Sequence, residues 1–252
     1  MMMNQGEKAE VFRALHQRGT PLVLWNVWDA ASTKAVTQAG AKAIATGSWS
    51  VAAALGFEDG EALPLDDALR VARQIVGATV LPVSVDFEGG YAVTPQGLER
   101  NVSQLIATGV VGLNFEDRVV RGEGLHTIED QSARIAAIRK TADDASVPLF
   151  INARTDVFFQ DDGVPPAAHM EEALERAAAY AKAGADGVFV PGLSDLSLIQ
   201  RLAQAQPLPV NVMRMGADIS VAAFAAADVS RVSHGPGPFI AAMKALREGA
   251  LV

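Results

Sequence analysis

The sequence predicts an α/β fold of the (β/α)8 barrel class, TIM-type, in a single domain that spans residues 1–252. A length of 252 residues suits one such barrel. Short continuous apolar runs, typical of strands that are buried on both faces, alternate with alanine-rich helical stretches. The phrases AGAKAIAT, TGVVGLNFED and AGADGVFVPG each place a glycine at a helix end before the next strand. An open doubly wound sheet is the alternative, but the NVWDAAS segment after the first strand lacks a dinucleotide-binding glycine pattern.

Each expected strand is a short apolar run that ends in polar residues. In chain order the strands are LVLWNVWD (22–29), AIATGS (43–48), PVSVDFE (82–88), VGLNFED (111–117), LFINARTD (149–156), GVFVPG (187–192), PVNVMRM (209–215) and RVSHGP (231–236). Helices are expected over 30–40, 64–76 and 170–183 and from about residues 95, 129 and 239, and a loop runs from 48 to 63. The first of these helices ends at Gly40, as helices commonly do.

Composition excludes several classes of protein. The chain carries 21 basic and 29 acidic residues, a net charge of -8, which argues against a nucleic-acid partner. It has no cysteine, so disulfides, thiolate metal sites and cysteine nucleophiles are ruled out. No apolar run approaches the roughly 20 residues of a membrane helix, and the polar N-terminal segment is unlike a signal peptide. We therefore expect a cytoplasmic protein that does not bind membranes.

Three carboxylates follow neighbouring strands, where barrel enzymes place their catalytic groups. Asp86 and Glu88 are two residues apart, so on a strand they share a face, and Glu116 ends the next strand. Three such acids repel one another unless a cation holds them, and oxygen ligands suit Mg²⁺ or Mn²⁺. The alternative is that each acid caps a helix or pairs with a nearby arginine. Asp117 points the other way and is left out.

Other strand ends offer groups for a substrate. The planar fork of Arg154 can bind a carboxylate, or it can form a structural ion pair with Glu116 or Asp156. The Thr-Gly-Ser segment at 46–48 can hold another carboxylate, or it is a simple turn. His126 and His234 are acid–base candidates, although a lone histidine is more often structural.

The motifs TGSWSVAAALGFED, VSVDFEGGY, GLNFED, INARTD and RVSHGP, in this order, resemble those of the isocitrate lyase/phosphoenolpyruvate mutase superfamily. The resemblance implies a (β/α)8 barrel that often exchanges its last helix with a neighbouring subunit, in a homodimer or homotetramer. It also implies Mg²⁺, held largely through water by acids matching Asp86, Glu88 and Glu116.

The resemblance further implies roles for individual residues. The spacing between Asp59 and Asp86 aligns Asp59 with an active-site acid of the family. The family holds the carboxylate of a 2-oxo acid with residues that match the 46–48 segment and Arg154, and Asn211 matches a substrate-contacting asparagine. The expected substrate-binding residues are Trp25, Thr46, Gly47, Ser48, Asp86, Asn114, Arg154 and Asn211.

The loop after the fourth strand departs from the family pattern. It reads RVVRGEGLHTIED and lacks the catalytic cysteine of isocitrate and methylisocitrate lyases, so neither activity is expected. The Lys and Asn of the mutase loop are also missing, which disfavours phosphonate rearrangement. Asp59, Arg154, Glu123 and His126 are the expected catalytic residues, and a metal-bound water is another base candidate.

Together these features predict a Mg²⁺-dependent carbon–carbon lyase that acts on a small 2-oxo or 2-hydroxy di- or tricarboxylate through an enolate. A 2-oxo-acid decarboxylase, an oxaloacetate hydrolase and a phosphonopyruvate-type P–C cleaving enzyme remain alternatives. A non-catalytic protein that binds 2-oxo acids is the alternative from a different class.

Overall fold

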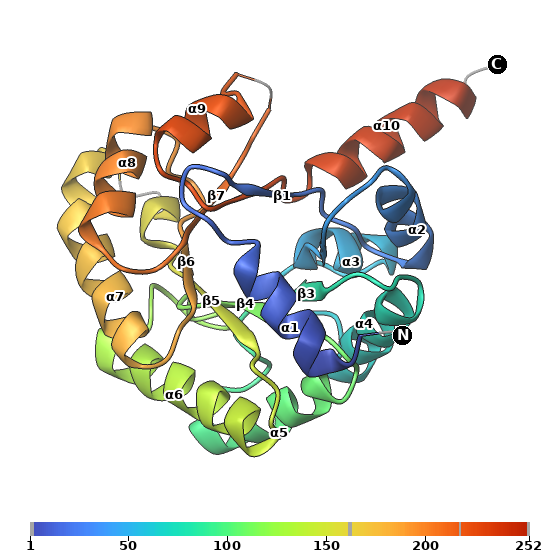
Figure 1. Cartoon of the computed structure of the whole chain (residues 1–252), viewed down its shortest axis with the longest axis horizontal. Coiled ribbons are helices and arrows are strands. Elements are labelled where there is room, and N and C mark those ends of the chain that lie inside the picture. The colour runs from blue at the N-terminus through green and yellow to red at the C-terminus, as the bar shows by residue number, and fades with distance from the viewer. Residues whose placement is uncertain (1–2, 161–162, 217, 251–252) are drawn as a thin grey trace.

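A computed structural model describes residues 3–160, 163–216 and 218–250 and confirms the TIM-type barrel (Figure 1). Within these residues, eight parallel strands form one sheet in the order β1-β8-β7-β6-β5-β4-β3-β2. The strands are β1 (Leu22–Leu24), β2 (Ile44–Ala45), β3 (Val83–Asp86), β4 (Gly112–Glu116), β5 (Phe150–Arg154), β6 (Gly187–Phe189), β7 (Val210–Met213) and β8 (Arg231–Ser233).

The barrel is nearly closed between β1 and β2. The backbone there forms one isolated parallel bridge, Val27 with Thr46, and the Val27 N–H donates to the Ala45 carbonyl at 2.8 Å. The Asn26 side chain adds two bonds: its Nδ2 donates to the Thr46 carbonyl, and its Oδ1 accepts from the His234 N–H, both at 2.8 Å. One side chain thus joins β1 to segments that follow β2 and β8.

Helices surround the sheet (Figure 1), and several of them begin at a residue whose side chain caps the helix. Asp29 caps α2 and Thr94 caps α5, whose first residue is a proline. The helices are α1 (Gln5–Ala14), α2 (Ala30–Gln38), α3 (Ser48–Ala54), α4 (Leu65–Gly77), α5 (Pro95–Ile106), α6 (Ile128–Asp144), α7 (Met170–Lys182), α8 (Leu196–Ala205), α9 (Val221–Ala226) and α10 (Gly237–Ala250), with short 3-10 turns at Val157–Phe159 and Pro166–His169.

Two helices differ from the sequence-based expectation. The segment expected as a loop between 48 and 63 contains α3, and α1 precedes the first strand. Asn4 and Glu7 form a reciprocal capping box that starts α1. The buried ring of Phe12 then packs edge-on against Phe150, near the start of β5, with ring centroids 5.5 Å apart. Helix α1 therefore closes the amino end of the barrel, opposite the strand ends that carry the polar residues.

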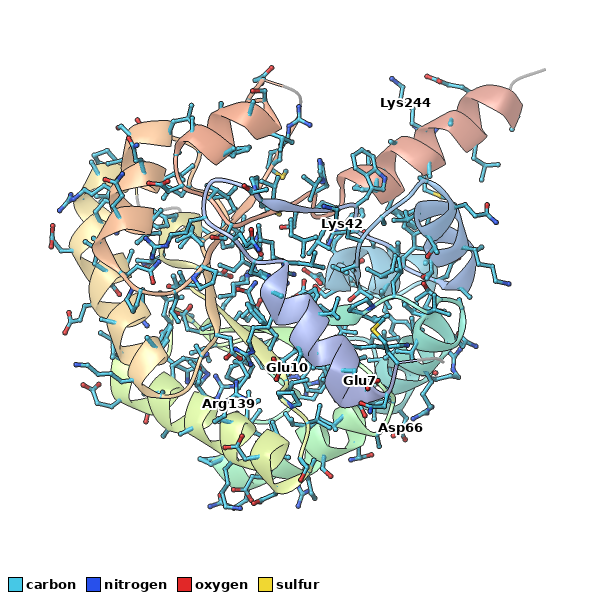
Figure 2. All side chains as sticks on the ribbon, viewed as in Figure 1. Glu7, Glu10, Lys42, Asp66, Arg139 and Lys244 are labelled. Carbon is cyan, nitrogen blue, oxygen red and sulfur yellow. The ribbon has the colours of Figure 1, made fainter. Side chains whose placement is uncertain are left out.

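Helix α10 begins against the barrel and then leaves it. Phe239 contacts the rings of Trp28 and Trp49, at centroid distances of 5.1 and 5.9 Å. Beyond this anchor the helix extends away from the other elements (Figure 1), and Lys244 projects from it clear of the barrel (Figure 2). No helix in the described part of the chain is both long and apolar enough to cross a membrane.

Candidate active site

A cavity of about 240 Å³ lies at the carboxyl ends of the strands. Its walls come from segments that follow or end most of the strands, as expected for the catalytic face of a barrel. The lining residues are Asn26, Gly47, Ser48, Trp49, Asp59, Asp86, Asn114, Arg154, Phe159, Phe189, Pro191, Met213, Met215, Ser233, Gly235 and Pro236. Of the predicted site residues, the structure brings Gly47, Ser48, Asp59, Asp86, Asn114 and Arg154 together here.

Asp86 is the one predicted metal acid that lines this cavity. Its Oδ2 accepts from the Ser48 N–H at 3.3 Å and from the Ser48 hydroxyl at 3.1 Å, and its own N–H donates to the Thr46 hydroxyl at 2.9 Å. Its Oδ1 is buried and has no hydrogen-bond partner. A buried carboxylate oxygen without a donor is costly unless a cation or water contacts it, so Asp86 fits a metal ligand.

The expected third strand does not reach Glu88, whereas the role of Glu88 as a metal acid stays a prediction. Strand β3 ends at Asp86, and Glu88 adopts a left-handed backbone with φ 49°. The Glu88 carboxylate accepts from the Glu61 N–H at 2.7 Å and from the Tyr91 hydroxyl at 3.4 Å. Burial, together with the negative charges of Asp59 and Asp86, raises the pKa of Glu88 to about 7. Such mutual repulsion is what a bound cation would relieve.

Glu116 and Arg154 face each other across the paired strands β4 and β5. Arg154 Nη1 lies 3.0 Å from Glu116 Oε2, while Nε and Nη2 bind the two carboxylate oxygens of Asp156 at 2.6 and 2.8 Å. Both structural ion pairs that compete with substrate binding are therefore present. Arg154 nevertheless lines the cavity, so it can also face a ligand. Burial raises the pKa of Glu116 against the opposing effect of Arg154.

The acids are not arranged as a complete coordination shell. Across residues 3–160, 163–216 and 218–250, no three Asp, Glu or His side chains converge into a ready-made metal site. A hard cation such as Mg²⁺ keeps several waters when few carboxylates reach it. Asp86 would then contact such an ion from the cavity wall, and Glu88 and Glu116 would hold it through water.

A pair of substitutions separates the two possible roles of Glu116. Glu116→Gln should weaken Mg²⁺ binding by about tenfold or more if Glu116 supports the cation, because water bound to the ion loses a charged acceptor. Asp156→Asn is the matched control, since Asp156 also binds Arg154 but interacts with no other predicted metal acid except Glu116. Calorimetric titration with Mg²⁺ checks both variants, and equal effects would assign Glu116 to the arginine alone.

The polar groups of the segment at 46–48 form hydrogen bonds with Asp86, and so the two donors of Ser48 are not free to bind a substrate carboxylate. The N–H and the hydroxyl of Ser48 both donate to Asp86, and Gly47 lines the cavity as the residue that precedes α3. Asp59 lies at the solvent-facing side of the same cavity. Partial burial and the charge of Asp86 raise the pKa of Asp59 above its ordinary value.

Asn114 and Asn211 belong to one buried network. Asn152 Nδ2 donates to Asn114 Oδ1 at 2.9 Å and to Asn211 Oδ1 at 3.0 Å. Asn211 Nδ2 faces the carbonyl oxygens of Val212 and Arg231 at 2.8 and 3.2 Å. Asn114 lines the cavity, whereas Asn211 is not among its lining residues. The Asn211 amide is turned into the barrel interior, and its substrate contact stays a prediction.

Glu123 and His126 are not brought to the cavity. The loop after β4 forms a small hairpin in which Arg118 bridges Leu125, and the exposed Glu123 lies near its tip. His126 lines a separate cavity of about 210 Å³ that it shares with Arg118 and Arg134. Burial and the charge of Arg134 lower the pKa of His126. Neither side chain reaches Asp86 or Arg154 in this arrangement, so their catalytic roles stay predictions.

Trp25 also lies outside the cavity. Residues on β1 alternate, so Leu24 and Asn26 face inward while Trp25 faces outward and is 49% exposed. Its ring contacts His234, which binds the Leu24 carbonyl through Nδ1 at 3.1 Å. The aromatic residues that line the cavity are Trp49, Phe159 and Phe189.

The apolar walls were not predicted. Phe159, Phe189, Met213 and Met215 line the cavity, and the sequence contains no signal that separates them from core residues. Phe159 lies in a 3-10 turn after β5, whose position depends on packing rather than on a local motif.

Comparison with known proteins agrees with this geometry. The family model described as phosphoenolpyruvate phosphomutase matches residues 12–251. A crystal structure from Burkholderia cenocepacia J2315, named as a candidate phosphonomutase, is 48% identical and superposes with a TM-score of 0.94, covering 97% of this chain and 98% of that one. The 2-methylisocitrate lyase of Escherichia coli K12 is 30% identical over 223 residues, which is 85% of this chain and 73% of the enzyme.

One solved structure with the same fold contains ligands. Phosphonopyruvate hydrolase in complex with oxalate and Mg²⁺ is 23% identical, with a TM-score of 0.84, and covers 98% of this chain and 85% of that one. The superfamily contains lyases, mutases and hydrolases that act on small carboxylates. The match over residues 12–251 shows that this chain belongs to the phosphoenolpyruvate phosphomutase family, within the phosphoenolpyruvate mutase/isocitrate lyase superfamily.

Proposed function

We propose that the chain is a Mg²⁺-dependent carbon–carbon lyase that acts on a small 2-oxo di- or tricarboxylate. The observation that supports this most directly is the cavity in which Asp86, Arg154 and Asn114 converge, with Asp86 Oδ1 left unpaired. A cation-binding acid, a guanidinium and an amide donor in one small cavity suit a compact dianionic substrate.

In this proposal Arg154 binds the substrate and Asp59 transfers a proton. Arg154 is held rigidly by Asp156 and Glu116 and would orient a substrate carboxylate with its remaining N–H groups. Asp59, with its raised pKa, is the group in the cavity best placed to give a proton to a carbanionic product. When bound, Mg²⁺ would supply Lewis-acid stabilisation of the negative charge that develops as the bond breaks.

The position of the loop after β4 favours some reactions of this class over others. Decarboxylation needs no base to start it, whereas retro-aldol cleavage of a 2-hydroxy acid or hydrolytic cleavage does. Since Glu123 and His126 lie away from the cavity, decarboxylation of an oxaloacetate-like acid needs the least rearrangement.

A second candidate function is phosphonopyruvate-type P–C cleavage. The 48% identity to the candidate phosphonomutase favours it. The same cavity could hold a phosphonate in place of the second carboxylate, since both are anions that a guanidinium and a cation bind. The absence of the mutase Lys and Asn from the loop at 118–130 argues against rearrangement but not against hydrolysis.

Purified protein should be incubated with Mg²⁺ and with oxaloacetate, 2-hydroxytricarboxylates and phosphonopyruvate in parallel, and the products identified by mass spectrometry. Product formation that EDTA abolishes supports the enzyme and names the bond. Tight binding of these acids without turnover would instead support a non-catalytic binding protein. We also propose a cytoplasmic location, because the N-terminal segment is polar and no apolar run is long enough for a membrane helix. Cell fractionation would check this location.

We also propose that α10 packs on a neighbouring subunit in a homodimer or homotetramer. A groove of about 510 Å³ lies on the outside of the barrel, lined by Val23, Trp25 and residues of α2 and the turn after it. The exposed apolar side chains of α10, Ile240, Met243 and Leu246, match it in character.

Leu246→Lys should therefore shift the protein towards monomer in analytical ultracentrifugation, because a charge replaces an apolar contact. Ala245→Lys, on another side of the same helix, is the control and should leave the assembly intact. A wild-type protein that sediments as a monomer would contradict the proposal.

A further inference from the structure

Arg231 is a buried cation beneath the candidate active site. It lies on β8 inside the barrel and is 1% exposed. Its Nη2 donates to Asn114 Oδ1 at 3.2 Å, while Nε and Nη1 have no hydrogen-bond partner. Among the ion pairs of the described residues, none includes Arg231. A buried guanidinium with so little compensation is costly and calls for a reason.

Arg231 is one of two donors that set which way the amide of Asn114 points. A guanidinium can only donate, so the Asn114 atom that faces it must be the oxygen. The same oxygen also accepts from Asn152 Nδ2 at 2.9 Å. With Oδ1 held from below by two donors, the NH₂ group of Asn114 remains for the cavity that Asn114 lines.

Asn152 is oriented by the same network. Its Nδ2 donates to both Asn114 Oδ1 and Asn211 Oδ1, and the Nδ2 of Asn211 faces only acceptors, including the Ser233 hydroxyl at 3.3 Å. Every amide in the layer beneath the cavity is therefore fixed in one orientation. The amide of Asn114 is the member of this layer that reaches the cavity.

We infer that Arg231 is a positioning residue that holds the Asn114 NH₂ group towards the cavity as a donor for an anionic oxygen of the substrate. The charge of Arg231 adds to this effect, because it polarises the amide and places positive potential below the cavity. Burial lowers the pKa of Arg231 to about 9, opposed by Asp86, so it remains protonated at neutral pH. The inference rests on the proposed function, since it takes a small carboxylate as the ligand.

The test measures binding of oxalate in the presence of Mg²⁺ by calorimetry, which needs no turnover. Asn114→Ala should weaken oxalate binding by about 10- to 100-fold, since a hydrogen bond to a charged acceptor is lost. Arg231→Met should weaken it by about tenfold although Arg231 does not touch the ligand. In the double variant the Arg231 substitution should have a clearly smaller effect, because the amide that it orients is gone.

Three results would overturn the inference or its basis in distinguishable ways. Equal effects of Arg231→Met with and without Asn114 would show that Arg231 does not act through the amide. A lower melting temperature with unchanged oxalate affinity would assign Arg231 a purely structural role. Wild-type protein that fails to bind oxalate would overturn the proposed function itself. If Arg231→Met does not fold, Arg231→Lys takes its place in the cycle, since an amine lacks the planar fork of the guanidinium. A loss of oxalate affinity that disappears in the Asn114→Ala background would support the inference, and an unchanged affinity would overturn it.

Discussion

Asp86→Ala should reduce turnover of the best substrate on the order of 10³-fold or more, because several kcal/mol of charge stabilisation depend on the cation. Of the three predicted metal acids, Asp86 alone lines the cavity, and its Oδ1 has no protein partner. The substitution should also weaken Mg²⁺ binding in calorimetry, while the circular dichroism spectrum stays unchanged.

Ser48→Ala is the matched control for Asp86. It removes the hydroxyl that donates to Asp86 Oδ2 at 3.1 Å but leaves the carboxylate and the Ser48 N–H in place. Its effect on turnover should be far smaller, about tenfold, the value of one hydrogen bond to a charged group. If Asp86→Ala retains turnover with Mg²⁺, the cation does not act at this cavity.

Asp117→Ala should destabilise the fold by about 3–5 kcal/mol, a large part of the roughly 5–15 kcal/mol that holds a typical domain together. Asp117 is fully buried at 0% exposure. Its Oδ1 accepts from the Asp156 N–H at 3.0 Å, and its Oδ2 binds the Tyr180 hydroxyl at 2.8 Å and Arg176 Nη1 at 3.2 Å. Removing the carboxylate leaves the Tyr180 hydroxyl and the Asp156 N–H without an acceptor and takes from Arg176 the one of its two carboxylate partners that is fully buried.

Urea unfolding measures this loss. Asp143→Ala is the control, since its carboxylate is 67% exposed and lies 4.0 Å from Arg139. That surface pair should contribute no more than about 1 kcal/mol. A loss below about 1 kcal/mol for Asp117→Ala would mean that Glu172, which also binds Arg176, compensates for the missing charge.

The alternation of side chains along a strand predicted correctly which way Asp117 points after β4. It did not apply to Glu88, which lies beyond the end of β3. Asn114 and Glu116 on β4 lie opposite Asn152 and Arg154 on β5, and the structural ion pair between Arg154 and Glu116, one of the two alternatives for Arg154, is present. Asp117 points to the helix side, as expected. Glu88 broke the pattern because its left-handed backbone ends the strand two residues early.

Loops and helix ends were less predictable because their positions depend on tertiary packing. The hairpin at 118–125 places Glu123 and His126 away from the cavity, and no local motif indicates which way such a hairpin folds. Helix α1 could have been found from its capping box at Asn4 and Glu7. The outward position of Trp25 could also have been found, since it alternates with the inward-facing Leu24.

The joint between β1 and β2 limits how the substrate range of this protein can change during evolution. Asn26 joins the ends of these strands to the segment after β8 and also lines the cavity. A substitution there that favours a new substrate would also weaken the ring of strands. Phe159 and Met215, on loops of the same cavity, form none of the bonds that close the barrel. New specificities are therefore expected to arise through these loop residues, while the asparagine stays unchanged.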